Sequence, residues 1–170
     1  MKTLSQYKNQ QLQIIQPSIW KRLYELRTAE NVLLTMSYPK WYSTTAVIEG
    51  FGEVWEIQKP SIWRSNLEIK NQLNQLPFAK FLAEKWGRGG TFELPNGQRI
   101  EYVFGMWKGK NELYSQQKIK LVSFIQPSFW KSSLNIVLEY DSELLEKNPW
   151  IIMVVYYQML ERRQHAAATS

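Results

Sequence analysis

Apolar and polar residues alternate with a period of two along most of this chain. Successive side chains of a β-strand point to opposite faces, so this pattern predicts strands with one buried face. The clearest examples are Leu12 with Ile14, Val32 with Leu34, Ala46 with Ile48, and residues 54–57. Turn-forming residues separate such segments at 28–31, 38–40, 49–52 and 94–98. Short strands joined by turns predict a mainly β fold, built as a meandering antiparallel sheet or barrel.

The best-defined hairpin is centred on Asn96 and Gly97. An Asn-Gly pair readily adopts the positive φ angles that a tight turn requires. Residues 91–94 and 99–104 flank this pair, and we expect them to form the two strands of the hairpin.

Residues 76–86 fit two patterns at once. Phe78, Phe81, Leu82 and Trp86 follow helical spacing, whereas Leu76, Phe78, Leu82 and Trp86 share the parity of one strand face. Spacing therefore leaves both helix and strand open for this segment.

The C-terminal segment from Pro149 to Leu160 is apolar without a polar face. Asn148 is expected to cap a helix there, with Pro149 in its first turn and residues 161–163 at its end. The apolar run is shorter than the ~20 residues that cross a bilayer, so we expect no transmembrane span. A helix that is apolar on every side is buried, and the sheet is expected to close around it.

A short repeat occurs three times, as Pro17–Lys21, Pro60–Arg64 and Pro127–Lys131. Each copy contains Pro-Ser, an apolar residue, Trp and a basic residue, and each follows an Ile-Gln pair closely. Three copies of one local sequence suggest three copies of one packing arrangement. We expect the rings of Trp20, Trp63 and Trp130 to be buried at strand starts. The adjacent Lys21, Arg64 and Lys131 are then expected to face outward.

Composition indicates one globular domain, which we place at residues 1–163 with a flexible tail at 164–170. The chain has 170 residues, 44% of them hydrophobic, and a formal charge of +6 spread along its length. It contains no cysteine, which excludes disulfides, thiolate nucleophiles and cysteine-ligated metals. With no secretory signal visible at the N-terminus, we expect a cytoplasmic protein.

Catalytic and metal-binding patterns are sparse. His165 is the only histidine, so a Ser-His-Asp triad or a histidine metal cluster cannot form within one chain. The acidic residues 141–146 lack the glycine and alternating oxygen ligands of a calcium loop, and we expect a turn there. Residues 86–90 are rich in glycine but lack the Lys-Ser/Thr of a phosphate loop, so a flexible turn is expected there too. No cofactor or metal is expected.

Taken together, the patterns resemble the tubby C-terminal-like superfamily, which includes tubby proteins, phospholipid scramblases and LURP-one-related proteins. The resemblance rests on residues 20–36 and 41–63, the hairpin at Gly97, and residues 129–136 and 149–160. It implies a closed twelve-stranded antiparallel barrel around a central hydrophobic C-terminal helix. It also implies that residues 76–86 form a strand rather than a helix.

The resemblance suggests functions without assigning residues to them. Tubby proteins bind phosphoinositides through basic residues, but no motif here fixes the matching positions. Scramblases carry palmitoylated cysteines, which this chain lacks. We expect a non-enzymatic module that binds either an anionic, phosphoinositide-like lipid headgroup or a protein partner. If lipid is the ligand, the protein is expected to be peripheral at the membrane. The candidate ligand-binding residues are Lys21, Arg64 and Lys131.

The sequence leaves two other functions open. The first is an enzyme that uses carboxylates on a small-molecule substrate, with Glu53 and Glu56 or Glu93 and Glu101 as possible pairs. Such residues are also normal on the outer face of strands, which favours the structural interpretation. The second is nucleic-acid binding, which we disfavour because most tryptophans lie in strand patterns that indicate core positions.

Overall fold

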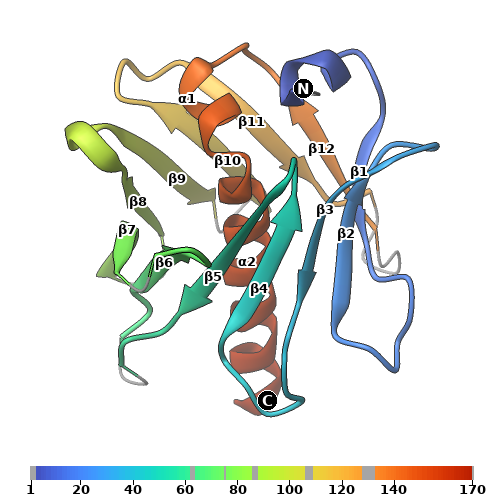
Figure 1. The fold of residues 1–170 in the computed structure, drawn as a ribbon, viewed down its shortest axis with the longest axis vertical. Coiled ribbons are helices and arrows are strands. Elements are labelled where there is room, and N and C mark those ends of the chain that lie inside the picture. The colour runs from blue at the N-terminus through green and yellow to red at the C-terminus, as the bar shows by residue number, and fades with distance from the viewer. Residues whose placement is uncertain are drawn as a thin grey trace.

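Twelve strands follow one another along the chain and close into a single antiparallel barrel in the computed structural model (Figure 1). The structure describes residues 3–61, 64–74, 76–85, 88–105, 109–127 and 133–169. The strands are β1 (Leu12–Ile15), β2 (Leu23–Arg27), β3 (Val32–Ser37), β4 (Ala46–Gly50), β5 (Glu53–Gln58), β6 (Leu67–Asn71), β7 (Pro77–Ala83), β8 (Gly89–Glu93), β9 (Arg99–Gly105), β10 (Lys110–Ser115), β11 (Lys120–Ile125) and β12 (Leu134–Leu138).

Each strand pairs with its neighbours in sequence, so the sheet is a continuous meander. The barrel closes where β1 pairs with β12, with Leu12 opposite Ile136 and Ile14 opposite Leu134. Closure leaves no free sheet edge in the barrel. The predicted fold class, a closed twelve-stranded antiparallel barrel around a C-terminal helix, is confirmed.

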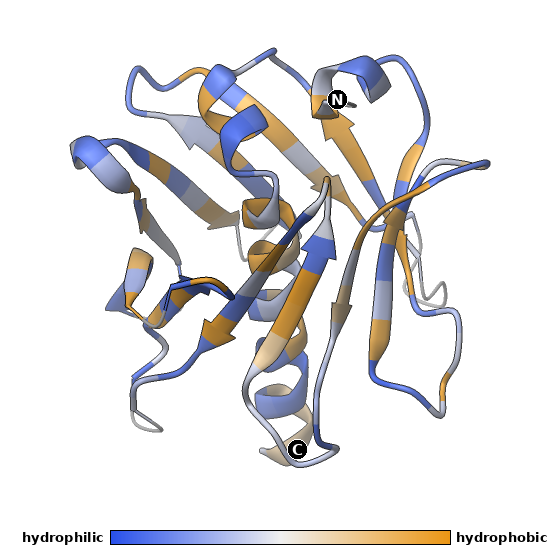
Figure 2. Cartoon of the chain, viewed as in Figure 1, coloured by the Kyte–Doolittle hydropathy of each residue, from blue (hydrophilic) through white to orange (hydrophobic). Residues whose placement is uncertain are grey.

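The C-terminal helix α2 (Trp150–Ala168) runs inside the barrel (Figure 1). Ile152, Val154 and Val155 are completely buried, as expected of a helix without a polar face. They share the core with inward strand residues such as Ile48 of β4, and Figure 2 shows hydrophobic residues along β4 and on the helix beside it. The core is therefore formed between one helix and a sheet that surrounds it.

Both predicted ends of α2 need correction. Asn148 does not cap this helix, because its side-chain amide donates to the backbone oxygen of Leu144 in the preceding short helix. That short helix, α1 (Glu143–Lys147), is capped by Ser142, whose hydroxyl accepts from the amide of Leu145. At its other end α2 continues past Arg163 to Ala168. The flexibility expected of residues 164–170 stays a prediction.

The acidic segment before α2 forms α1 rather than the expected turn, and its acids hold local structure together. Asp141 pairs with Lys8, and Glu143 pairs with Lys147 within the helix. Glu146 accepts hydrogen bonds from the amides of Leu4 and Ser5, the first residues of a 3-10 helix, η1 (Leu4–Tyr7). A carboxylate suits the N-terminus of a helix because the free amide groups there carry partial positive charge.

Residues 77–83 form strand β7, as the resemblance implied. The inward face differs from the parity considered above: Ala79 and Phe81 are buried, whereas Leu82 is exposed. A register shift opposite β6, between Ile69 and Lys70, accompanies this arrangement. Trp86 lies outside the described residues.

The predicted hairpin at Asn96 and Gly97 is confirmed. β8 and β9 pair on either side of it through the short 3-10 helix η3 (Pro95–Gly97), and both Asn96 and Gly97 have positive φ angles of 63° and 71°. The glycines expected in a flexible turn, Gly89 and Gly90, instead belong to β8. A Cβ atom at Gly89 would lie 1.9 Å from the backbone oxygen of Tyr102, so the close approach of β9 requires glycine there.

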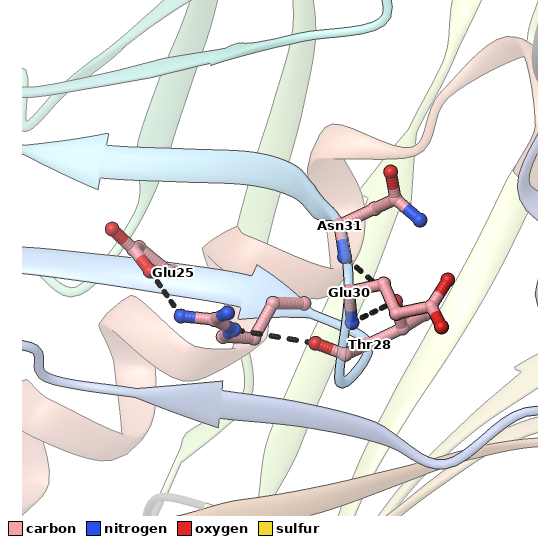
Figure 3. Close-up of polar contacts among 5 residues, drawn as sticks. Glu25, Thr28, Glu30 and Asn31 are labelled. Carbon is pink, nitrogen blue, oxygen red and sulfur yellow. Dashed lines mark hydrogen bonds and ion pairs between the residues drawn. The ribbon is translucent and has the colours of Figure 1, made fainter.

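The turn at residues 28–31, between β2 and β3, is held by one hydroxyl group (Figure 3). Thr28 Oγ1 accepts from the amides of Glu30 and Asn31 at 3.2 and 3.0 Å. Arg27 donates to the backbone oxygen of Thr28 and pairs with Glu25. Such side-chain bonds to local amides are the usual reason that threonine favours turns.

Candidate functional site

In an antiparallel meander, every connection from an odd strand to the next even strand lies at the same end of the barrel. Here these connections are residues 16–22, 38–45, 59–66, 84–88, 106–109 and 126–133. The C-terminal half of α2 reaches the same end, since Tyr157 donates to the backbone oxygen of Thr44 and Arg163 to the side chain of Gln126. We call this end, with residues 161–163 of α2, the basic end.

Charge is sorted between the two ends of the barrel. The described cations of the basic end are Lys21, Arg22, Lys40, Lys59, Arg64, Lys85, Arg88, Arg162 and Arg163, whereas its described acids are Glu84 and Glu161. At the opposite end, the described connections carry Glu30, Glu139, Asp141, Glu143 and Glu146 against Lys8, Lys118 and Lys147. The modest net charge of +6 therefore conceals a strongly polarised molecule.

The first two copies of the repeat each contain a turn hydrogen bond, and the first copy corrects the expected burial of its tryptophan. The amide of Lys21 donates to the backbone oxygen of Ser18, and the amide of Arg64 donates to that of Ser61, both at 3.3 Å. Trp20 occupies the middle of its turn and is 90% exposed, so the predicted burial is wrong. Side chains at the centre of such a turn extend beyond the last strand pair and find no core to enter. Trp63 and Trp130 lie outside the described residues.

The connection between β3 and β4 contains a second turn with the same hydrogen-bond pattern and exposed aromatic side chains at its centre. The amide of Ser43 donates to the backbone oxygen of Lys40 at 3.0 Å, which places Trp41 and Tyr42 at the turn centre. Trp41 is 84% exposed and Tyr42 is 64% exposed. We call this turn and the one at residues 18–21 the aromatic turns.

Arg22 joins the two aromatic turns. Its Nη1 atom donates to the backbone oxygens of Trp41 and Ser43, at 2.9 and 3.2 Å. Its guanidinium carbon also lies 3.6 Å from the centroid of the Tyr38 ring, within the range of a cation–π contact. Arg22 is therefore a structural cation, and the two turns lie side by side.

Tyrosines of the core, with the partly buried Tyr38 at its edge, support the aromatic turns. Tyr38 stacks on Tyr157 of α2 with ring centroids 6.1 Å apart, and Tyr24 meets Tyr156 edge to face at 5.3 Å. Burial is the main cause that raises the pKa of Tyr156, to about 12, so its hydroxyl stays neutral. These contacts fix the β3–β4 connection against the central helix.

The three candidate residues are only partly placed by the structure. Lys21 and Arg64 are exposed, follow equivalent turns, and lie at the same end with β3, β4 and β5 between their strands. Among the described residues neither forms an ion pair. Lys131 lies outside the described residues. The two placed candidates share a face of the molecule rather than a single pocket.

A cavity of about 210 Å³ also opens at the basic end, between α2 and the strands. Its cations are already engaged: Lys59 pairs with Glu161 at 2.9 Å. Arg162 donates to the hydroxyl of Tyr102 at 3.0 Å and lies over the ring of Phe104. The cavity is therefore close to charge balance, and the cations free to meet an anion are those on the turns.

The carboxylate pairs considered from the sequence do not form a common site. Glu93 pairs with Arg99, and Glu101 with Lys118. Glu56 accepts from Gln58. Within the described ranges no group of three or more His, Asp or Glu residues is arranged to hold a metal ion.

A shallow hollow at the end of the barrel opposite the basic end gathers Glu53, Glu143 and Glu146 around apolar side chains. Glu143 is paired with Lys147, and Glu146 is bonded to the amides of η1. Among the described residues, Glu53 is thus the one carboxylate of this hollow without such a partner. A single carboxylate does not provide the acid and base that hydrolysis of a glycoside requires.

Sequence reasoning missed Ile19, Trp20, Lys40, Trp41 and Tyr42 as surface residues. A signal for them was present, because each of the six connections at the basic end contains one tryptophan with a basic residue next to it or nearby. Trp63, Trp86, Trp107 and Trp130 belong to this pattern by sequence and lie outside the described residues.

Comparisons with protein-family models, curated proteins and solved structures found no match to this chain. In the parts of the chain that the structure describes, no helix has the length and apolar character needed to cross a membrane.

Proposed function

We propose that this chain is a non-enzymatic binding module of the tubby-like type and that its basic end binds anionic lipid headgroups. The observation that carries the proposal is the sorting of charge between the two ends of the barrel. An even scatter of cations would serve only solubility, whereas a face with one sign of charge attracts a surface of the opposite sign.

The individual cations are suited to this role because they are exposed. Lys21, Arg64, Lys85 and Arg88 lie on three different connections, and no described acid forms an ion pair with any of them. A cation near an anionic membrane surface contributes about 1 kcal/mol. One such residue binds weakly, but several on one face act together.

The proposal also includes the place of action. A module that recognises anionic headgroups would work at the cytoplasmic leaflet, which carries most of the anionic lipid of a cell membrane. The chain would then be a cytoplasmic protein that is peripheral at the membrane. The carboxylate-dependent enzyme has less support, because Glu56, Glu93 and Glu101 are engaged in separate ion pairs and hydrogen bonds, which leaves Glu53 without a second free candidate acid.

Co-sedimentation with vesicles tests the proposal. We expect the wild-type chain to bind vesicles of phosphatidylcholine with phosphatidylserine, to bind phosphatidylcholine alone far less, and to bind more weakly as salt rises. The double variant Lys21→Glu/Arg64→Glu should lose at least about 2 kcal/mol, roughly 30-fold in affinity, from the two lost cations, and repulsion of the two new carboxylates adds to this loss. Adding Lys131→Glu tests the third candidate.

The matched control is Lys8→Glu/Lys118→Glu, which changes the net charge equally at the opposite end. Circular dichroism establishes that both variants fold. Retained binding by the control and lost binding by the Lys21/Arg64 variant support the proposal. Equal binding to neutral and anionic vesicles, or an equal loss in both variants, would contradict it.

A further inference from the structure

We infer that the two aromatic turns insert into the bilayer, so that the ligand is an assembled anionic membrane rather than a soluble phosphate or a free headgroup. The inference rests on the proposed function for the location of the membrane. It adds the means by which the chain enters the membrane and the residues responsible: Ile19, Trp20, Trp41 and Tyr42.

Turn centres normally carry small or polar residues such as Gly, Asn, Asp and Ser, because these suit the backbone and the solvent. Here two turns place large apolar side chains at both central positions, and three of the four are more than 80% exposed. Neither the turn geometry nor the packing of the barrel requires such residues. Their exposure is explained when another apolar phase covers them.

The residue types indicate a lipid phase. Tryptophan and tyrosine concentrate at the boundary between headgroups and acyl chains, where an amphipathic ring is partly dry and partly hydrated. Lys21 follows Trp20 directly, and Lys40 precedes Trp41, so each aromatic turn pairs inserted rings with a cation at headgroup depth. Lys40 also lies 5.7 Å from the centroid of the Tyr42 ring.

The two turns act as one body because Arg22 links them and the central helix anchors the second. Arg22 joins them through its bonds to Trp41 and Ser43, and its guanidinium group stacks on Tyr38. Tyr157 of the central helix holds the backbone at Thr44 with a 2.8 Å hydrogen bond. A surface that is already ordered loses little conformational entropy when it binds. Insertion therefore needs no rearrangement of the barrel.

Two measurements on one variant pair test insertion. The variant Trp20→Ala/Trp41→Ala removes the rings but no charge, and Leu73→Ala/Leu76→Ala removes two exposed apolar side chains at the opposite end. We expect the first variant to bind phosphatidylserine vesicles at least about tenfold more weakly at physiological salt, and the second to match the wild type. Glycerophosphoserine at millimolar concentration should not compete with the vesicles.

Quenching of tryptophan fluorescence supplies the second readout. Lipids brominated near the headgroup end of the acyl chain should quench the wild type more strongly than the Trp20/Trp41 variant, compared at equal bound fractions. Binding that depends on Lys21 and Arg64 but shows no difference in quenching would overturn insertion and leave the proposed function intact. Loss of all vesicle binding in the wild type would overturn the proposed function itself. If glycerophosphoserine displaced the vesicles, the ligand would be the free headgroup.

Discussion

Trp20 and Trp55 show how far one residue type can differ in its contribution to stability. Trp20 lies at a turn centre in solvent, whereas Trp55 in β5 is 2% exposed and packs in the core. We expect Trp20→Ala to change the free energy of unfolding by less than about 0.5 kcal/mol. Trp55→Ala should cost about 3–5 kcal/mol, because it leaves a large cavity. Urea denaturation followed by circular dichroism measures both, and a large loss at Trp20 would show that its ring packs after all.

Glu112 on β10 provides a test at acid pH. Burial alone would raise the pKa of Glu112. Hydrogen bonds from Tyr114 at 2.7 Å and Lys120 at 3.0 Å outweigh burial, so the pKa lies below its usual value. A lowered pKa in the folded state stabilises the protein above the unfolded pKa, and this stability is lost as the pH falls through the folded value.

The expected result is a pH-dependent gap between two proteins. Glu112→Gln should lower the free energy of unfolding by about 0.5–1 kcal/mol at pH 7. The gap should shrink as the pH falls below the ordinary carboxylate pKa of about 4.3, and it should close once the pH passes the lower folded value. Glu49→Gln, at an exposed position of β4, controls for the loss of a surface carboxylate. A gap that did not shrink at all as the pH fell from 5 to 2 would mean that packing, not charge, accounts for the effect.

At the scale of elements, α2 and the barrel depend on each other. Because Val155 is completely buried, Val155→Asp places an unpaired charge in the core, and we expect it to prevent folding. Val155→Ala should fold with a loss of about 2 kcal/mol, which gives a measurable intermediate case. Gln164→Asp, at an exposed position of the same helix, serves as the control. A folded Val155→Asp protein with normal stability would place the helix outside the core.

The elements that the sequence predicted well are those with one dominant pattern. Period-two alternation identified strands such as β1, β3, β4 and β5, and the apolar run identified the buried helix, whereas β10 and β11 were not predicted individually. The pattern was less informative at boundaries: Asn148 suits a helix cap by type, but its side chain bonds to Leu144. The sequence also did not show which side of β7 faces the core. Phe78 and Phe81 are both aromatic, and the register shift between β6 and β7 accompanies the burial of Phe81.

At the scale of the whole molecule, the candidate site depends on which connections meet at one end. The repeat drew attention to Lys21 and Arg64, but a local pattern cannot tell the start of a strand from the centre of a turn, which is why Trp20 was placed in the core. The connections that follow odd-numbered strands lie at one end and carry most of the cations, whereas those that follow even-numbered strands lie at the other end with most of the acids. That sorting requires the strand count, which alternation alone leaves open around residues 76–86.

The helix α2 connects the two ends of the barrel. It begins after α1 at the end opposite the basic end, and Arg162 and Arg163 lie on its C-terminal half at the basic end. Anionic ligands at the basic end would meet these cations before the helix itself.

The seam between β1 and β12 determines when this protein can finish folding during its synthesis. Neighbouring strands can pair as soon as both have left the ribosome, but β1 waits for a partner that lies more than a hundred residues later in the chain. Until residues 134–160 emerge, the sheet has an open edge, and the apolar inner face of the sheet is not yet covered by α2. Chaperones bind such surfaces, and unprotected chains aggregate through them. The nascent chain is therefore most exposed to aggregation just before β12 and α2 are made, and the barrel can close only after they emerge.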